Sequence, residues 1–366
     1  MWLSNTSGLI KEYTGWGKLS LREAPYTYAR VSAMKSKLIR RDDYNKLMKM
    51  KVGDIIRFLQ ETDYKREMDE MAVSHTGVEL VEFALNKSIA KTFAKLKRIA
   101  EYDDLRIVME EYMKRRAIWN IKTIIRGKFI GEDESKIKEL VMATSRGEEA
   151  FLNELLKKDS VEDVIRSLKF LSPEQTKNAL DLLRDKRTLF GVENTLDNYY
   201  YSSLLEFSKR IPSQGIVIRE FIRNEIDVLN IKTVLRLKKH FMPLKEIEKF
   251  IMLKGARISK ESLARLASAD SVENVIALLQ KMGYRKAFKD AGEKSKKDLA
   301  YVELRLNKYM LDRVALLLHK HPLSVDVILG FMFAKEIEIR NLRTIIKGKQ
   351  LSLKEEFIEG ELVIGG

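Results

Sequence analysis

The chain has no cysteine among its 366 residues, which excludes a disulfide framework and a thiolate metal site. Proline is rare, with 5 residues, and the abundance of Leu, Glu, Lys, Arg and Ala predicts helix almost throughout. No stretch approaches the roughly 18 to 20 uninterrupted apolar residues of a membrane-spanning helix. The N-terminus lacks the basic and apolar regions of a signal peptide. We therefore expect a soluble all-α protein, and the lack of cysteine fits the cytoplasm.

Recognisable catalytic and ligand-binding motifs are also lacking. Gly127-Lys128 and Gly348-Lys349 have neither the upstream glycine nor the following Ser or Thr of a phosphate-binding loop. The chain contains no G-x-S-x-G elbow and no H-E-x-x-H pair. His319 and His321 are two residues apart, so on a helix they would point to different sides. The sequence thus predicts no catalytic, cofactor-binding or metal-binding residues.

Basic residues outnumber acidic ones, 68 to 53, which gives a formal net charge of +15. Such an excess favours an anionic partner, whether nucleic acid, anionic lipid or an acidic protein surface. Acidic residues nevertheless occur in every segment of the chain. A solvated helical surface of mixed charge is therefore the alternative explanation.

A motif of Asn, aliphatic, Lys/Arg, Thr, aliphatic, aliphatic and Lys/Arg occurs three times. The copies lie at 120–126, 230–236 and 341–347, so their first residues are 110 and 111 positions apart. A period this long indicates that each copy belongs to a small multi-helix unit rather than to a short solenoid repeat. On a helix, the aliphatic residues of the first copy form one arc, which predicts contact with the core.

Small and polar residues of the first copy form another arc, made of Asn120, Thr123 and Gly127. This arc predicts the close approach of a second helix, with Asn and Thr bonding to backbone groups there. Leu237 replaces the glycine in the second copy, so we expect a looser approach in that unit.

Two further patterns repeat at the same interval. A short run that begins with valine at 52, 161 and 272 reads as a helix start, and Ser160 and Ser271 precede two of the copies. A Glu-x-x-Leu segment that begins at 82, 193 and 303 leads each time into a long helix with apolar periodicity.

The three patterns keep the same order, and they divide the chain into three similar helical units of about 110 residues. We expect an N-terminal extension with a short helix or arm, three repeats and a C-terminal tail that frays, at 1–24, 25–135, 136–243, 244–350 and 351–366. An open solenoid normally has distinct capping repeats. Three equal units instead favour closure about a pseudo-threefold axis, in the shape of a collar or socket.

Basic residues form a third arc on each copy of the motif. These candidate partner-binding residues are Lys122, Arg126, Lys128, Lys232, Arg236, Lys238, Arg343, Lys347 and Lys349. One interpretation is that the three arcs line a rim or hollow and bind an acidic partner. The other is that Lys and Arg simply complement the dipole in the last turns of their helices. Under the first, charge reversal at Arg126, Arg236 and Lys347 should weaken docking and leave helicity unchanged.

Three segments carry a family resemblance, namely 28–39, 120–128 and 341–349. Over about residues 26–350 the chain resembles the C subunit of the archaeal A-type ATP synthase, a relative of the d subunit of the V-type ATPase. The resemblance implies a funnel of three helical domains at the cytoplasmic face of the cell membrane. There it would sit on the rotor ring of proteolipid subunits, receive the central stalk and couple ion flow to ATP synthesis or hydrolysis, without an active site. The N-terminal extension departs from the family pattern.

A second function remains open from the residues alone, that of a basic helical scaffold that binds nucleic acid. Aromatic residues do not alternate with the basic runs, as they would in a platform that stacks bases. Nucleic-acid binding would also weaken steeply with salt, because it releases counterions. A socket for a protein stalk would instead depend on a large buried area.

Overall fold

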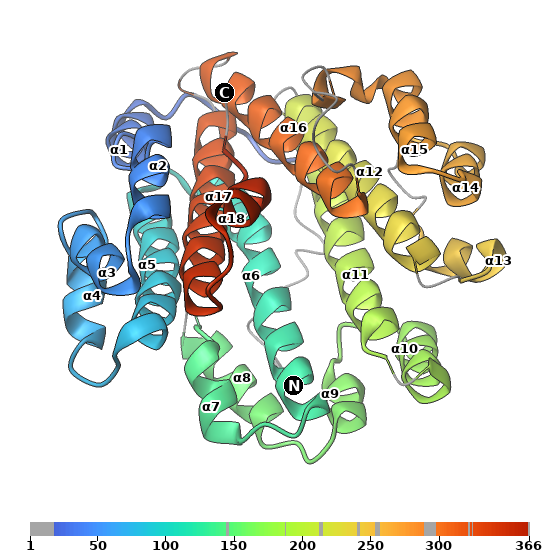
Figure 1. The fold of residues 1–366 in the computed structure, drawn as a ribbon, viewed down its shortest axis with the longest axis horizontal. Helices are drawn as coiled ribbons and strands as arrows, with labels where there is room; N and C mark the ends of the chain where they lie inside the picture. Colours follow the sequence, from blue (N-terminus) through green and yellow to red (C-terminus); the bar gives the residue numbers. More distant parts are fainter. Residues whose placement is uncertain are drawn as a thin grey trace.

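The structure is a computed structural model, and its described residues are helical with no strand, which confirms the predicted all-α class (Figure 1). The described part comprises residues 18–143, 146–186, 188–211, 215–239, 242–252, 257–288, 298–320, 323 and 325–364. The expected short helix or arm at the start of the chain, His240 and His321 lie outside these residues. The divisions between the extension, the repeats and the tail stay predictions.

Six long helices form the centre of the molecule and follow one another in pairs. They are α5 (Gly77–Ile99), α6 (Asp103–Phe129), α11 (Phe190–Ser208), α12 (Gly215–Lys239), α16 (Leu299–Lys320) and α17 (Val325–Gln350). The three copies of the asparagine motif lie on α6, α12 and α17, which we call the motif helices. Each long helix packs against the next along the chain, and α17 also packs against α5.

Shorter helices lie outside the long ones in three groups, at the left, bottom and right of Figure 1. The first group is α1 (Pro25–Lys35), α2 (Arg41–Lys49), α3 (Val52–Gln60) and α4 (Lys65–Met71). The second is α7 (Glu134–Leu140), α8 (Arg146–Leu156), α9 (Val161–Ser167) and α10 (Pro173–Lys186). The third is α13 (Leu244–Ile247), η1 (Glu248–Phe250), α14 (Lys260–Ser268), α15 (Val272–Leu279), η2 (Gln280–Tyr284) and η3 (Arg285–Phe288).

The predicted helix starts are confirmed, since α3, α9 and α15 each begin at the repeated valine. The Ser160 hydroxyl accepts a hydrogen bond from the backbone N–H of Asp163, and that of Ser271 accepts one from Asn274, both at 3.1 Å. These caps satisfy backbone donors that the first turn of a helix leaves free. Lys51 occupies the corresponding position before α3, and its side chain makes no capping hydrogen bond.

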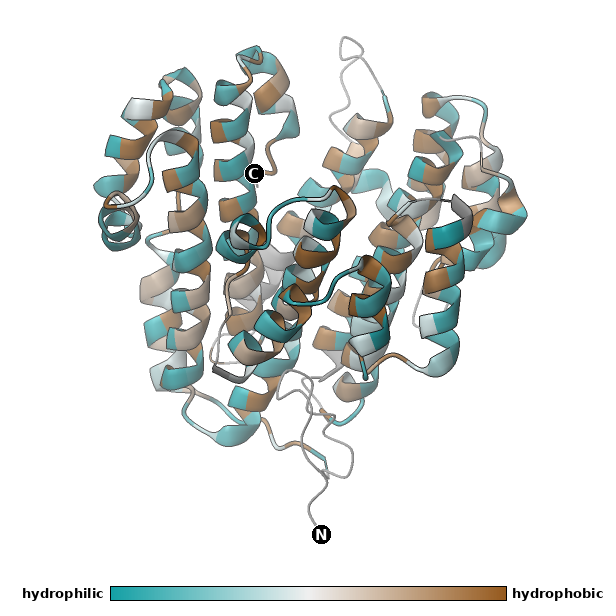
Figure 2. Ribbon diagram, turned by 90° about the horizontal axis from the view of Figure 1, so that it is seen from below, coloured by the Kyte–Doolittle hydropathy of each residue, from teal (hydrophilic) through white to brown (hydrophobic). Residues whose placement is uncertain are grey.

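The predicted apolar arc of the first motif helix lies in the core. Ile121, Ile124 and Ile125 are fully buried, and Ile118 is nearly so. Hydrophobic and hydrophilic positions alternate along the long helices in Figure 2, as the 3.6-residue period of an amphipathic helix requires.

The C-terminal tail does not fray over its described residues, so that expectation is wrong. It forms α18 (Glu355–Glu361), which packs against α17, and Ile358, Leu362 and Val363 are buried. The mixture of acidic and apolar residues in this segment is the pattern of a short amphipathic helix with one buried face. The described end of the N-terminal extension also contacts the rest of the chain, because the N–H of Leu19 donates to the carbonyl of Arg210 at 2.9 Å.

Candidate interface of the motif helices

The asparagine that begins each motif binds the backbone of a residue 22 positions later. Asn230 Nδ2 donates to the carbonyl of Met252 at 2.7 Å, and its Oδ1 accepts from the N–H of Met252 at 2.8 Å. The same pair of bonds joins Asn120 to Met142 and Asn341 to Val363. In each case the bound residue follows an extended residue at the end of a short helix. The expected bonding of Asn to backbone groups is confirmed.

The glycine of the motif gives one of these short helices room to approach. A Cβ placed on Gly127 would lie 2.5 Å from a side-chain carbon of Ile137 in α7, and one on Gly348 would lie 2.6 Å from Ile358 in α18. Any larger residue would therefore displace the short helix. In the second copy Leu237 takes this place and is itself buried. Thr123, by contrast, donates only to the carbonyl of Trp119 in its own helix.

Replacement of Asn230 by alanine should lower the free energy of unfolding by about 2–4 kcal/mol, because it leaves the buried N–H and carbonyl of Met252 without partners. Urea denaturation followed by circular dichroism measures the loss. Asn274→Ala is the matched control, since the Asn274 side chain is exposed on α15. A loss no larger than that of the control would contradict the role given to Asn230.

The last base of each motif pairs with the glutamate that begins a Glu-x-x-Leu segment. Arg126 of α6 binds Glu193 of α11 through two hydrogen bonds of 2.6 and 2.8 Å. Arg236 of α12 binds Glu303 of α16 in the same way. Lys347 of α17 lies 2.8 Å from Glu82 of α5. The third contact therefore joins the last motif helix to a helix near the start of the chain.

The first base of each motif makes a second contact between the same helices. Lys122 lies 2.6 Å from Asp197, Lys232 donates to Asn307, and Arg343 donates to Asn86. Burial, and then the nearby charge of Arg340, lower the pKa of Lys232 to about 7. These partners lie four residues after the glutamates of the preceding contacts. The two repeated patterns thus meet across neighbouring helices.

The other predicted basic residues are placed less uniformly. Lys128 Nζ donates to the backbone carbonyls of Leu156 and Lys158, and Lys349 lies 2.9 Å from Glu355. Lys238 is half-buried near the end of α12. Most of the predicted basic residues therefore have a polar contact within this chain. Their proposed contact with a partner stays a prediction.

A buried polar cluster lies where α6, α12 and α17 come together. Arg115 donates to Glu225 at 2.5 Å and to Glu336 at 3.2 Å, and also to the hydroxyl of Tyr201 at 2.7 Å. Burial works to lower the Arg115 pKa, but the charges of Glu225 and its other neighbours raise it well above its usual value. Burial raises the pKa of the Glu336 carboxyl.

Arg115, Glu225 and Glu336 each lie five residues before the asparagine of their motif. The sequence signal for this cluster is the position five residues before each motif asparagine, which is Arg in the first copy and Glu in the other two. None of these three residues is among the candidate residues that the sequence predicted. The contacts of the Arg126–Glu193 type were not predicted either, although the asparagine motif and the Glu-x-x-Leu segment that supply their residues had both been found.

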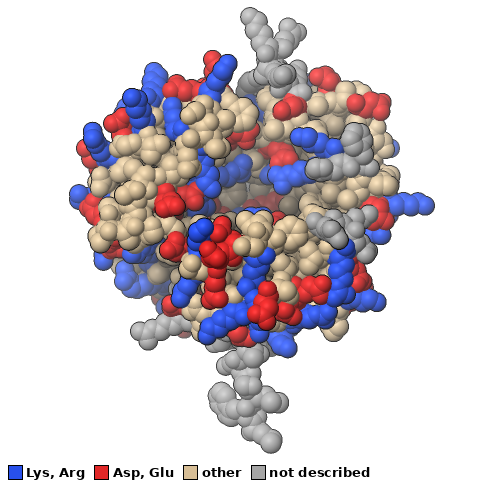
Figure 3. Space-filling model, turned by 60° about the horizontal axis from the view of Figure 1, so that its bottom comes forward, with Lys and Arg blue, Asp and Glu red and all other residues tan. Residues whose placement is uncertain are grey.

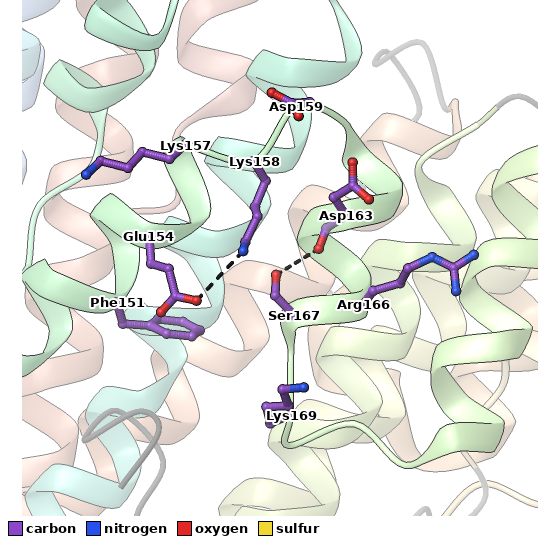
Figure 4. Close-up of a pocket in the computed structure, with 9 residues that line it drawn as sticks. All are labelled: Phe151, Glu154, Lys157, Lys158, Asp159, Asp163, Arg166, Ser167 and Lys169. Carbon is purple, nitrogen blue, oxygen red and sulfur yellow. Dashed lines mark hydrogen bonds and ion pairs between the residues drawn. The ribbon is translucent and has the colours of Figure 1, made fainter. Parts of the chain in front are cut away.

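A cavity of about 590 Å³ lies between α8 and α9 (Figure 4). Lys158 points toward Glu154 there, and the Ser167 hydroxyl donates to the carbonyl of Asp163 in its own helix at 2.8 Å. Within the described part of the chain, no group of three or more His, Cys, Asp or Glu residues could hold a metal ion. None of the described helices is both long and apolar enough to span a bilayer.

These observations define the class of the protein. It is an all-α protein whose helices are joined to one another by polar residues that repeat along the chain. Residues 27–361 match the family described as ATP synthase (C/AC39) subunit. The C subunit of the A-type ATP synthase of Methanococcoides burtonii is 34% identical over 340 residues, which cover 93% of this chain and 94% of that protein. The protein of the same name from Methanosarcina mazei is 34% identical over 363 residues, 95% of this chain and 98% of that protein.

A third relative, the C subunit of the A-type ATP synthase of Archaeoglobus fulgidus, is 29% identical over 342 residues, 93% of this chain and 96% of that protein. The chain belongs to the ATP synthase (C/AC39) subunit family. This confirms the resemblance found in the sequence. As a family member, the chain is an accessory subunit of a rotary ATP synthase complex.

Proposed function

We propose that the chain is the non-catalytic adaptor of the central rotor in an A/V-type ATP synthase. It sits on the membrane rotor ring at the cytoplasmic face, receives the central stalk and passes torque between the two. The observation that carries this proposal is the family match over nearly the whole chain. Family membership favours the adaptor over the nucleic-acid scaffold.

The shape that this function requires is a closed funnel of three similar units. Closure is supported by the contacts of Arg126, Arg236 and Lys347, each of which joins a motif helix to the long helix that begins the next pair. The contact from α17 returns to α5, so the series has no free end among these helices. Arg115, Glu225 and Glu336 meet at the point where a pseudo-threefold axis would pass.

The interface that we propose for the stalk is the hollowed face in Figure 3, where Lys and Arg side chains gather around the hollow together with some Asp and Glu. Such a concave, charged surface favours an acidic partner segment. The basic residues of the motif helices are the proposed contacts, with Arg126, Arg236 and Lys347 the most exposed of them.

The proposal is tested by capture of purified central-stalk subunits, and separately of duplex DNA, on the immobilised chain at about 0.1 M and 0.5 M salt. We expect salt-resistant capture of the stalk and no retention of DNA. Binding of DNA that disappears at high salt, without capture of the stalk, would overturn the adaptor in favour of the scaffold.

The basic contacts are tested by the triple variant Arg126→Glu, Arg236→Glu and Lys347→Glu. We expect loss of stalk capture together with a loss of about 1–3 kcal/mol in stability, because three partly exposed ion pairs become repulsive. The matched control adds Glu193→Arg, Glu303→Arg and Glu82→Lys, which restores each pair with its charges exchanged. If this control regains stability and also regains capture, the bases act only within the chain and their role in docking is wrong.

A further inference from the structure

A cavity of about 350 Å³ between α5, α6 and α17 is lined by five basic side chains, one acidic side chain, a tryptophan, a threonine and two isoleucines. The residues that matter for its chemistry are Arg116, Arg340, Arg343, Lys347, Trp119 and Thr344. The acidic residue that lines it, Glu336, is already bound by Arg115, and Lys347 is paired with Glu82. Among the described residues Arg116, Arg340 and Arg343 form no ion pair, although the charges of Glu148, Glu361 and Glu82 act on them.

Two of the arginines share one uncharged acceptor. Arg116 donates to the side-chain oxygen of Asn86 at 2.9 Å, and Arg343 donates to the same atom. Arg116 is 6% exposed, and its Nε is buried without a hydrogen-bond partner among the described residues. A buried guanidinium normally needs an anion, because an unpaired buried charge is costly.

The electrostatics of the pair agree with this deficit. Burial, and then the charge of Arg343, lower the pKa of Arg116 to about 9. Burial also lowers the pKa of Arg343. Both guanidinium groups lie beside the ring of Trp119, at 4.2 and 5.4 Å from its centroid, so their positions are fixed without a carboxylate.

The corresponding positions in the other copies do not accumulate charge in this way. Ile226 and Ile337 stand where the first copy has Arg116, by the 110-residue register. Lys122, which corresponds to Arg343, has the carboxylate of Asp197 as its partner. Lys232 of the second copy also has an uncharged acceptor, Asn307, but only the cavity places two guanidinium groups on one such acceptor.

We propose that this cavity binds a small free oxyanion of the inorganic phosphate type. Guanidinium groups bind phosphate oxygens through paired, charge-assisted hydrogen bonds. Arg116 and Arg343 supply the paired donors, and Arg340 and Thr344 also line the cavity. The site is independent of the adaptor role, since it uses a ligand that neither ring nor stalk provides.

The test is isothermal titration calorimetry of the complete chain with inorganic phosphate, at constant ionic strength in chloride buffer. We expect saturable binding at one site. Arg116→Gln and Arg343→Gln should each weaken it roughly ten- to hundredfold, the usual effect of losing one charge-assisted hydrogen bond. Lys122→Gln is the matched control, because Lys122 has the register position of Arg343, pairs with Asp197 and lies outside this cavity, so the affinity should stay unchanged.

Sodium glutamate, titrated in place of phosphate, separates a free oxyanion from a carboxylate of a protein partner. Binding of phosphate at least tenfold tighter than glutamate supports the proposal. No saturable heat with phosphate, an equal loss in the Lys122→Gln control, or glutamate bound as tightly as phosphate would overturn it. Circular dichroism of each variant confirms that the affinities refer to folded protein.

Discussion

Arg115→Ala is expected to lower the free energy of unfolding by about 3–5 kcal/mol, because it leaves the buried carboxylate of Glu225 and the partly buried one of Glu336 side by side without their cation. The loss is large for one residue, since Arg115 contacts both motif helices that pack beside α6 in this cluster. Its removal also takes a donor from the hydroxyl of Tyr201. Chemical denaturation at pH 8 measures the change.

The deficit of this variant should shrink as the pH falls. Burial already raises the pKa of Glu336 above its unfolded value. A carboxyl with a raised pKa binds its proton more readily in the folded state, so protonation stabilises the fold below that pKa. Arg115→Ala should therefore lose less stability at pH 5 than at pH 8, relative to the unaltered chain.

The control for this prediction removes the acids as well. Arg115→Ala combined with Glu225→Gln and Glu336→Gln leaves no buried charge in the cluster, and it should recover most of the loss at pH 8. Equal deficits at both pH values, or a triple variant as unstable as the single one, would show that packing rather than charge accounts for the effect of Arg115.

The helices and their local contacts could be predicted from the sequence because they depend on short-range patterns. The 3.6-residue period placed the aliphatic residues of the motif in the core, and Ser160 and Ser271 marked helix starts. The asparagine and glycine of the motif predicted close approach of a neighbour. They could not identify α7 and α18 as that neighbour, because a small residue indicates room for close packing but not which helix packs there.

The polar contacts between helices could not be predicted, because they depend on which helices become neighbours. Arg126 and Glu193 are 67 residues apart, and the repeat that marks Glu193 does not say which helix lies beside it. Lys347 and Glu82 are joined only because α17 packs against α5. The tail was misjudged for a related reason. The apolar residues of α18 are too few to identify a core helix until the groove beside Gly348 is known.

Glu338→Ala is expected to cost about 3–5 kcal/mol of stability, because it leaves the charge of Lys335 buried and unpaired. Glu338 lies on α17, where it accepts hydrogen bonds from Lys335 at 2.7 Å and from the hydroxyl of Tyr64 at 2.5 Å. It also accepts from the backbone N–H of Ile39. Burial and then the charge of Glu338 raise the pKa of Tyr64 well above its usual value, so Tyr64 remains a donor.

Hydrogen exchange measured beside global denaturation would locate the effect of Glu338→Ala. Protection should fall first in α3 and α4, because Tyr64, which immediately precedes α4, loses its bond to α17. Lys335→Met with Glu338→Gln is the control, since the glutamine oxygen still accepts from the N–H of Ile39, its NH2 group donates to the hydroxyl of Tyr64, and both charges are gone. This double variant should lose less than half as much stability as Glu338→Ala. If the two losses are equal, the hydrogen bonds to the first group of helices outweigh the buried ion pair, and the charge argument for Glu338 is wrong.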